Sequence, residues 1–412
     1  MLRFNCNRRS FVKGGFSAAV ISGLPASAMA LEPLRDVRYE QDFDELWNSL
    51  RDRYCFFGSK ATDWQKVRQL YRPMALAADS DDIFLDVIGR VLSELYDAHT
   101  HLSNPRDGAR RWPLYDLLVE RDGKEVRIVA VQPGSAAADA GLAPGDSITA
   151  IEDVAIEQVI RDIAPKCLSR PDPAADSYSI NLAVAGRRGR PRLLTVKAKG
   201  AAVRRLSLPL KQWPDIADVE SKRLDQGIGY IAIRSFANSA IADAFDAALT
   251  DLRDCDGLLI DVRQNGGGDT AVARPVMGRF VSKRKPYAMM RRRDGAGLSA
   301  PWTEWVDPKG PFTYTKPIVI LVDHWSASMA EGFPMGMRGI GRAIIVGTAM
   351  MGLGAAVFPI RLDRSGIEAQ YSAEPVYDVH DNPRWMLRPD VEVGDGKDIL
   401  AVGIETLRAR IG

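Results

Sequence analysis

The stretch LIDVRQNGGGD, Leu259–Asp269, decides the fold class, because it joins an apolar strand-like run to three consecutive glycines. Three glycines allow backbone conformations barred to other residues and a close approach of N–H groups to a ligand. No Gly-Lys-Ser/Thr or Gly-x-Gly-x-x-Gly spacing follows, which disfavours a nucleotide-phosphate site. A turn that aims N–H groups at a developing oxyanion fits the same residues.

Strands and helices alternate on both sides of this stretch. Strand-like runs are Ile228–Ile233, Gly257–Val262, Ile318–Val322 and Ala343–Val346, with a helical segment at Ala240–Leu252. Such alternation predicts a mixed α/β class with a layered core, helices packed on a sheet. We assign this core to residues 206–412.

Residues 111–205 change to a β-rich pattern. A strand at Glu125–Val131, a Pro-Gly turn, a short helix at Ala136–Ala140 and a Pro-Gly-Asp loop precede a strand at Ser147–Ile151. This order, with the letters PGSAAADAGL, resembles a bacterial protease PDZ domain; a generic βαβ turn is the alternative. PDZ domains bind peptides as added strands. No glycine-bearing carboxylate loop is evident at Trp112–Leu117, so strict C-terminal recognition is not predicted.

Residues 31–110 show helical periodicity. Apolar residues recur at i, i+3 and i+4 in two sets: Phe43, Leu46, Trp47, Leu50, Tyr54, and Phe84, Val87, Ile88, Val91, Leu92, Leu95. These stripes predict an N-terminal helical unit. The second stripe ends immediately before Asp97-Ala98-His99-Thr100-His101.

The first thirty residues resemble a twin-arginine export signal. Arg8-Arg9 precedes a moderately apolar segment, and Ala28-Met29-Ala30 is a small-x-small cleavage pattern. The alternative, an amphipathic helix, is disfavoured by the glycines and Pro25. Cleavage after Ala30 predicts a periplasmic or otherwise exported mature chain.

Composition limits the partners. The 412 residues carry a formal net charge of +2, so bulk electrostatics favours neither nucleic acid nor an anionic membrane. No apolar run outside the signal is long enough for an integral membrane span. Cys55, Cys167 and Cys255 remain in the mature chain without disulfide or zinc spacing, so we expect buried thiols. Neither a metal nor an organic cofactor is predicted, and the sequence does not give the oligomeric state.

The segment VDHWSASMAEGF, Val322–Phe333, places two serines where a strand meets a helix. A hydroxyl there is exposed, and the N–H groups that follow point toward charge formed during an attack on a carbonyl. The alternative is that Ser326 or Ser328 only caps the helix.

Four motifs in this order resemble the tail-specific, or C-terminal-processing, serine peptidases and their tricorn-core relatives. The motifs are DVRQNGGG, SASMAE, Gly347–Gly354 and Arg388–Val393, and the resemblance extends over the whole mature chain. It implies a ClpP/crotonase-like core and a serine-type peptidase.

The resemblance also implies roles for individual residues. Ser328, three positions before Glu331, matches the family nucleophile, which leaves Ser326 as a neighbour. The oxyanion donors would be the N–H groups of Met329 and Gly267, because relatives often carry proline, which has no N–H, at the position of Gly266.

The base differs from the lysine of the best-known relatives. Leu353 stands at that position, and no lysine occurs between Lys316 and Lys397. The motif Asp97-Ala98-His99-Thr100 resembles the tricorn branch and implies His99 as the base.

The other histidines are predicted to be structural: His101 in an extended segment, His324 at a strand end and His380 in a surface loop. No acid stands in register within Asn382–Leu387 to orient the base, leaving Asp381 or Glu331.

Two hypotheses remain. The first is an exported serine endopeptidase that cleaves polypeptides bound as extended strands through the PDZ domain; a hydrolase of small esters or peptides is a minor variant of it. The second is a catalytically inactive relative that acts as a PDZ-based peptide-binding module. Pro334, inside the predicted helix after Ser328, is a departure compatible with the second.

Overall fold

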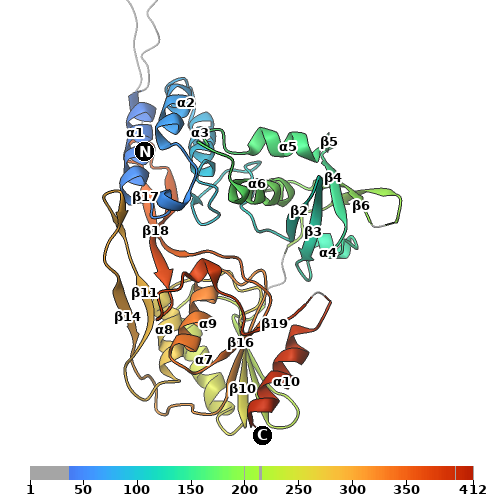
Figure 1. The fold of residues 1–412 in the computed structure, drawn as a ribbon, viewed down its shortest axis with the longest axis vertical. Coiled ribbons are helices and arrows are strands. Elements are labelled where there is room, and N and C mark those ends of the chain that lie inside the picture. The colour runs from blue at the N-terminus through green and yellow to red at the C-terminus, as the bar shows by residue number, and fades with distance from the viewer. Residues whose placement is uncertain (1–36, 199, 213–215, 395, 412) are drawn as a thin grey trace, which may run out of the picture. The chain divides into compact units, whose positions relative to one another are not determined.

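The computed structural model describes residues 37–198, 200–212, 216–394 and 396–411 (Figure 1). The predicted signal segment, residues 1–30, lies outside the described residues. The N-terminal helices are α1 (Val37–Arg53), α2 (Trp64–Leu76) and α3 (Asp81–Ser93), with a 3-10 turn η1 (Phe57–Ser59). Both predicted apolar stripes are buried between these helices.

Reciprocal bonds join α1 to α2. The indole N–H of Trp47 donates to the Trp64 carbonyl at 2.8 Å, and that of Trp64 donates to the Trp47 carbonyl at 3.1 Å. Asp63 caps α2 by accepting the Lys66 N–H at 3.0 Å. Each buried indole therefore has the hydrogen-bond partner that burial demands.

The helical unit is completed by a hairpin from the far end of the chain. Strands β17 (Ala355–Arg361) and β18 (Glu368–Tyr377) contribute apolar side chains to the same cluster as the helices. Buried Asp42 accepts the backbone N–H groups of Arg364 and Ser365, at 2.9 and 2.7 Å. Figure 1 shows the orange hairpin running up beside the blue helices. The sequence-based domain boundary at residue 110 does not anticipate this sharing of one core.

A second sheet extends from this hairpin. Its order is β1-β18-β11-β14, with β17 also paired to β18. The further strands are β1 (His101–Leu102), β11 (Lys285–Met290) and β14 (Trp302–Val306), and a small separate hairpin joins β12 (Arg293–Asp294) to β13 (Gly297–Leu298). The pairing of β1 with β18 is antiparallel and brings His101 opposite Gln370.

The β-rich region folds as an antiparallel sheet of order β2-β3-β4-β6-β7, with β5 at β4. The strands are β2 (Leu117–Asp122), β3 (Glu125–Val131), β4 (Ser147–Ile151), β5 (Val154–Ala155), β6 (Arg192–Lys197) and β7 (Val203–Leu208). The helices are α4 (Ala136–Asp139), α5 (Ile156–Ile163) and α6 (Pro173–Ala185). The predicted strands at 125–131 and 147–151 match β3 and β4.

The α/β core is built on a six-stranded sheet of order β19-β16-β15-β10-β9-β8. The strands are β8 (Val219–Arg223), β9 (Ile228–Ile233), β10 (Gly257–Asp261), β15 (Ile318–Val322), β16 (Ile344–Gly347) and β19 (Val391–Glu392). All neighbours pair in parallel except β8 with β9. Parallel pairing with both faces covered explains why these strands read as continuous apolar runs.

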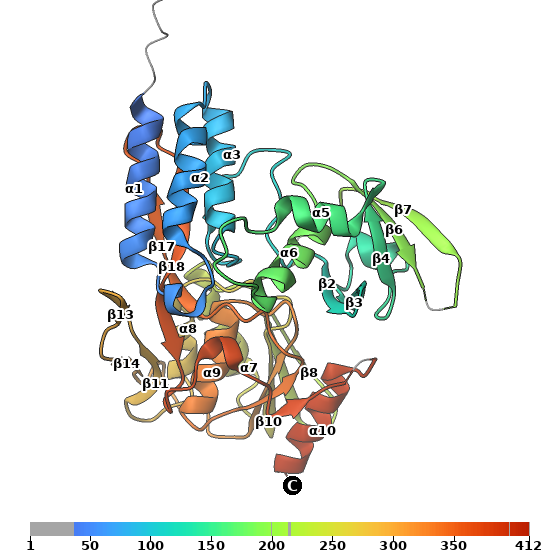
Figure 2. The ribbon, with the colours of Figure 1, turned by 45° about the horizontal axis from the view of Figure 1, so that its top comes forward.

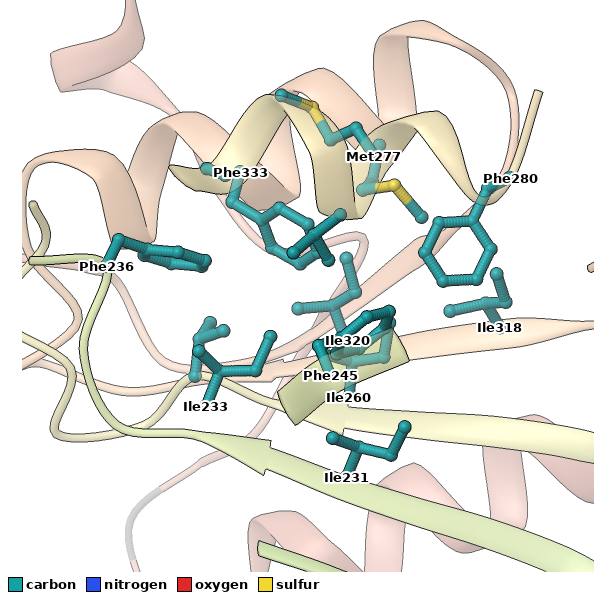
Figure 3. Close-up of a cluster of buried hydrophobic side chains, with 14 of the residues drawn as sticks. Ile231, Ile233, Phe236, Phe245, Ile260, Met277, Phe280, Ile318, Ile320 and Phe333 are labelled. Atoms are coloured by element: carbon teal, nitrogen blue, oxygen red, sulfur yellow. The ribbon is translucent and has the colours of Figure 1, made fainter. Parts of the chain in front are cut away.

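Helices cover the two faces of this sheet. Alternate side chains of β10 lie on opposite faces of the sheet. Leu258 and Ile260 belong to the hydrophobic cluster on one face, and Leu259 belongs to the cluster on the other. The first cluster faces α7 (Ala240–Asp251), α8 (Thr270–Gly278) and α9 (Met329–Gly339); the second faces α10 (Ile399–Ile411). Figure 2 shows α10 apart from the other three helices. In Figure 3, Phe333 of α9 and Met277 of α8 project toward isoleucines of the strands, which packs both helices against the sheet.

Within the described residues, no helix combines the length and apolar character that a membrane crossing needs. Cys55, Cys167 and Cys255 are unpaired and buried, as the sequence predicts.

Candidate active site

The glycine turn at the end of β10 is held by Asn265, whose side chain is fully buried. Its Nδ2 donates to the Ile233 carbonyl at 2.9 Å, and its backbone carbonyl accepts the Ala327 N–H at 2.9 Å. Its Oδ1 accepts the Gly267 N–H at 2.8 Å. The N–H that the sequence assigned to an oxyanion is therefore already engaged, and in this structure Gly267 is not available as that donor.

Ser326 is a structural residue. Its buried hydroxyl accepts the Asp323 N–H at 3.0 Å and donates to the Val262 carbonyl at 2.9 Å. Asp323 in turn accepts the Gln264 N–H at 3.0 Å. These bonds tie the ends of β10 and β15 together, so the Ser326 hydroxyl is engaged in holding the junction.

Ser328 stands at the junction of β15 and α9 in a strained backbone conformation. Its φ is 54° and its ψ is −113°, which non-glycine residues rarely adopt. It is the helix N-cap and is half-buried. Strain of this kind persists only where the surrounding structure fixes it, and it is enriched at functional sites.

The glycine turn touches this serine. A Cβ added to Gly267, whose φ is +98°, would lie 2.7 Å from the Ala327 carbonyl, 2.8 Å from Ser328 Cβ and 2.9 Å from the Met329 nitrogen. Only glycine fits there. Within the described chain, the N–H groups of Met329 and Gly268 have no hydrogen-bond partner, so two donors remain free beside the serine.

Glu331, in the first turn of α9, is fully buried and holds the junction together. Its carboxylate accepts the N–H groups of Ser328 at 2.9 Å, Gly352 at 3.0 Å and Leu353 at 2.8 Å. Burial raises the pKa of Glu331 to about 7, although nearby Arg384 and the three N–H donors act in the opposite direction. Its oxygens bond within this junction, so it does not orient a histidine.

Arg384 is a functional candidate that the sequence did not reveal. Its guanidinium donates to the carbonyls of Leu353, at 2.6 and 2.9 Å, and of Ala355, at 3.0 Å. Burial lowers the pKa of Arg384, and Glu331 opposes that effect. The loop at Leu353 is thus held from two sides, by the buried Glu331 carboxylate and the buried Arg384 guanidinium.

A cavity of about 380 Å³ opens beside Ser328. Its polar lining includes Ser328, Asp269 and Arg384, and its apolar lining includes Met290, Met335, Val357 and Val376. Glycine-turn residue Gly268 and helix residue Met329, which carry the two free N–H groups, also line it. A polypeptide side chain fits this mainly apolar space.

His99 is buried without a partner for its ring. It is 7% exposed, and its Nδ1 makes no hydrogen bond in the described chain. Burial lowers the pKa of His99 to about 4, Asp97 opposes this effect, and Arg384 adds to it. Arg384 is therefore near enough to act electrostatically on both His99 and Glu331. No hydrogen bond joins His99 to Ser328 among the described residues, and His99 does not line the serine cavity.

Asp97 fixes the segment that carries His99. Its carboxylate accepts the His99 backbone N–H at 3.0 Å and the hydroxyls of Thr100 at 2.8 Å, Ser372 at 2.8 Å and Tyr54 at 3.2 Å. The pKa of Asp97 stays below its ordinary value although burial alone would raise it, because Lys60, His99 and Ser372 favour the carboxylate. Asp97 thus holds the backbone of His99, whereas no carboxylate among the described residues forms a hydrogen bond with the imidazole.

The remaining sequence candidates lie elsewhere. His101 stacks on Trp112 at 3.6 Å and bonds the Leu102 carbonyl and Gln370, so both ring nitrogens are used. Asp381 forms an exposed ion pair with Arg291 at 2.7 Å. Neither acid proposed from the sequence, Asp381 or Glu331, is bonded to His99. In the described part of the chain, no group of three or more potential metal-binding side chains occurs.

Comparisons with protein families follow the same division of the chain. Family models match residues 227–393 (Peptidase family S41), residues 36–93 (Tricorn protease C1 domain) and residues 127–165 (PDZ domain). These matches support a tail-specific protease family, as do the C-terminal processing proteases among the relatives below. This is a family of serine-type peptidases, and the predicted mixed α/β class, PDZ domain and tricorn-like helical unit are confirmed.

Individual relatives are distant. The chain is 27% identical over 290 residues to carboxy-terminal processing protease CtpB of Bacillus subtilis, covering 67% of this chain and 55% of that protein. It is 24% identical over 400 residues to the chloroplastic C-terminal processing peptidase of Tetradesmus obliquus, covering 90% and 79%. Among solved structures, mature CPAF complexed with lactacystin matches with a TM-score of 0.61 and 14% identity, covering 91% and 97%. That last likeness concerns the fold.

Proposed function

We propose that this tail-specific protease is an active, exported serine endopeptidase. Ser328 attacks the scissile carbonyl, and His99 accepts its proton and returns it to the leaving amine. The observation that carries the proposal is the strained Ser328 in contact with the glycine turn and beside a cavity. Strain, close packing and an adjoining cavity together are not needed for a residue that only caps a helix.

The oxyanion would be held by the N–H groups of Met329 and Gly268, which are free and line the cavity. This replaces Gly267, whose N–H is bonded to Asn265. The low pKa of His99 keeps its ring neutral near pH 7, as a base requires. Proton transfer further requires His99 to come within about 2.6–3.2 Å of Ser328, a bond expected when substrate is bound.

The substrate would be polypeptide bound as an added strand at the PDZ domain, with an apolar side chain in the serine cavity. Export rests on Arg8-Arg9 and the Ala28-Met29-Ala30 pattern. Replacing both arginines with lysine should retain the uncleaved precursor in the cytoplasm, which cell fractionation and N-terminal sequencing would detect. Equal export of the variant would refute this part.

The catalytic proposal is tested by intact mass after incubation with a fluorophosphonate. The wild type should gain one adduct that maps to Ser328, and Ser328→Ala should gain none. Ser326→Ala, which removes the neighbouring hydroxyl, is the matched control for site assignment. His99→Ala should label at least about 100-fold more slowly, the contribution typical of a general base, while His101→Ala controls for loss of a nearby, half-buried imidazole.

A second candidate, the inactive peptide-binding module, is favoured by one observation: no hydrogen bond joins His99 to Ser328 in the described chain, and the imidazole lacks an acid partner. It predicts that the folded wild type binds unfolded peptides and does not label. If folded His99→Ala labels as fast as the wild type, Ser328 remains the proposed nucleophile and His99 is refuted as its base.

A further inference from the structure

A second cavity lies in the helical and PDZ regions, apart from the serine cavity. It has a volume of about 490 Å³ and is lined by parts of α2, α3, α5, α6 and the segment 105–112. It shares no lining residue with the serine cavity. We call it the arginine cavity, after Arg110 and Arg187 in its lining.

Arg110 and Arg187 stand side by side, because their backbones form an antiparallel bridge. Arg187 donates to the Gly108 carbonyl at 2.9 Å. Arg110 makes no side-chain hydrogen bond, ion pair or ring contact with any described residue. Burial and the charge of Arg187 lower the pKa of Arg110 to about 10, and Asp162 only partly opposes them. Arg110 is half-buried, and no described residue uses its donors, so an anion in the cavity could form charge-assisted hydrogen bonds with them.

Among the other charged groups of the lining, exposed Arg90 also lacks a side-chain hydrogen bond or ion pair with the described residues, and the rest have partners. Arg106 pairs with Asp86, and the Lys166 ammonium donates to the Arg161 carbonyl. Glu94 accepts the hydroxyl of Tyr71 at 2.6 Å and the N–H groups of Lys166 and Cys167 at 2.8 to 2.9 Å. Asp162 accepts the Gln158 amide at 2.7 Å. The unmatched charge in the lining is therefore positive. Arg90 and Arg187 are exposed, and Arg110 is the half-buried member of this set.

Much of the remaining lining is apolar. It comprises Leu70, Met74, Leu85, Leu102, Ile163 and Leu182. Trp112 adds an aromatic surface that stacks on His101 and lies under the Arg188 guanidinium. An anion held by the arginines would therefore carry an apolar group into this space. A carboxylate suits it, since a guanidinium binds carboxylate through two parallel hydrogen bonds.

We propose that the arginine cavity binds a monocarboxylate that carries an apolar chain, with Arg110 and Arg187 holding the carboxylate. The chain can come from the C-terminal residues of a peptide or from a fatty acid, which present the same chemistry. The site is distinct from the serine cavity. Thr100, His101 and Leu102 line it, so the ligand contacts the segment that begins at His99.

The test is isothermal titration calorimetry on the full chain carrying Ser328→Ala, which prevents turnover. The probes are acetyl-Leu-Leu, its C-terminal amide, octanoate and inorganic phosphate. Acetyl-Leu-Leu or octanoate should bind at one site, and the amide should bind at least about tenfold more weakly because it lacks the charged acceptor. The tighter of the two carboxylates identifies the source of the chain.

Arg110→Gln should weaken carboxylate binding at least about tenfold. Arg161→Gln, which removes an equal charge on α5 outside the cavity lining, should leave it unchanged. Arg110→Gln removes no internal bond, so its melting temperature without ligand should match or exceed that of the parent, which separates lost binding from lost folding.

Three results would overturn the proposal: undiminished binding by folded Arg110→Gln, equal binding of acid and amide, or tighter binding of phosphate than of either carboxylate. Because calorimetry does not depend on catalysis, failure of this proposal and failure of the peptidase proposal are distinguishable.

Discussion

Replacing Gly267 with alanine should disable the candidate nucleophile directly. The new Cβ would lie 2.8 Å from Ser328 Cβ and 2.9 Å from the Met329 nitrogen, whereas ordinary contacts begin at 3.4 Å. Relief requires the serine or the turn to move by roughly half an ångström. Misplacement of a reacting group by about 1 Å can cost about 100-fold in rate, so we expect a loss of at least about tenfold.

The same substitution should also lower stability. Alanine at a φ of +98° costs about 1–2 kcal/mol in backbone strain, and crowding in a packed site costs typically about 1–3 kcal/mol. Together these amount to about 2–5 kcal/mol. The backbone strain alone would not displace Ser328. The labelling rate therefore reports on the crowding of Ser328, whereas the free energy of unfolding reports on the crowding and the backbone strain together.

The assay is the rate of fluorophosphonate labelling at Ser328, measured beside denaturant unfolding. Gly266→Ala is the matched control, because its Cβ would meet nothing within 4 Å and its φ is not in the left-handed region. It should label within about threefold of the wild type and unfold with nearly unchanged free energy. Folded Gly267→Ala that labels as fast as Gly266→Ala would refute the close-contact reasoning.

Three further perturbations follow from the buried ionisable groups. Burial raises the folded-state pKa of Glu331 from 4.5 to about 7, so between these pH values the folded state binds more protons than the unfolded state. The free energy of unfolding should therefore fall on the order of 3 kcal/mol as pH rises from 4.5 to 7. Glu331→Gln should flatten this pH dependence of stability, and an unchanged slope would contradict the assignment. The lowered pKa of His99, about 4, predicts that labelling loses rate below about pH 5, and an acid limb near the ordinary histidine value of 6.5 would argue against His99 as the base. Asp97→Asn places an NH₂ group among the four hydrogen-bond donors that Asp97 accepts and should lower the free energy of unfolding by about 3 kcal/mol. Asp86→Asn, at a partly exposed ion pair, is the control and should lower it by under about 1 kcal/mol. Equal losses would show that the Asp97 bonds stabilise the fold no more than the exposed pair does.

The core sheet was predictable because its signals are local. The runs at 228–233 and 318–322 match β9 and β15 to the residue, since strands buried on both faces must be apolar throughout. The place of Ser328 at a strand-to-helix junction follows from the same runs. The proposal that Ser328 is the nucleophile needed the family resemblance, because an isolated serine there is equally suited to capping.

The supporting residues could not be found locally. Arg384 reaches the loop at Leu353 from 31 positions away, and nothing in its neighbours marks it as buried. The bond from Gly267 to Asn265 depends on which way one amide side chain points. Strand β18 mixes polar and apolar residues, and its partners include β1, 269 positions away between His101 and Gln370. Such pairings depend on tertiary packing that local patterns do not encode.

The hairpin β17–β18, which closes the helical unit, sets an order of events for a chain emerging from the ribosome. The first helices end at Ser93, whereas their apolar partners Ile360 to Ala373 lie near the end of the chain and are made much later. At a synthesis rate of about 5–20 residues per second, the apolar stripes of α1 to α3 stay uncovered for roughly 15–50 s before that hairpin is made. During this interval the helices are open to binding by chaperones and to aggregation, and a fragment that stops before residue 355 retains the helices without the strands that complete their core.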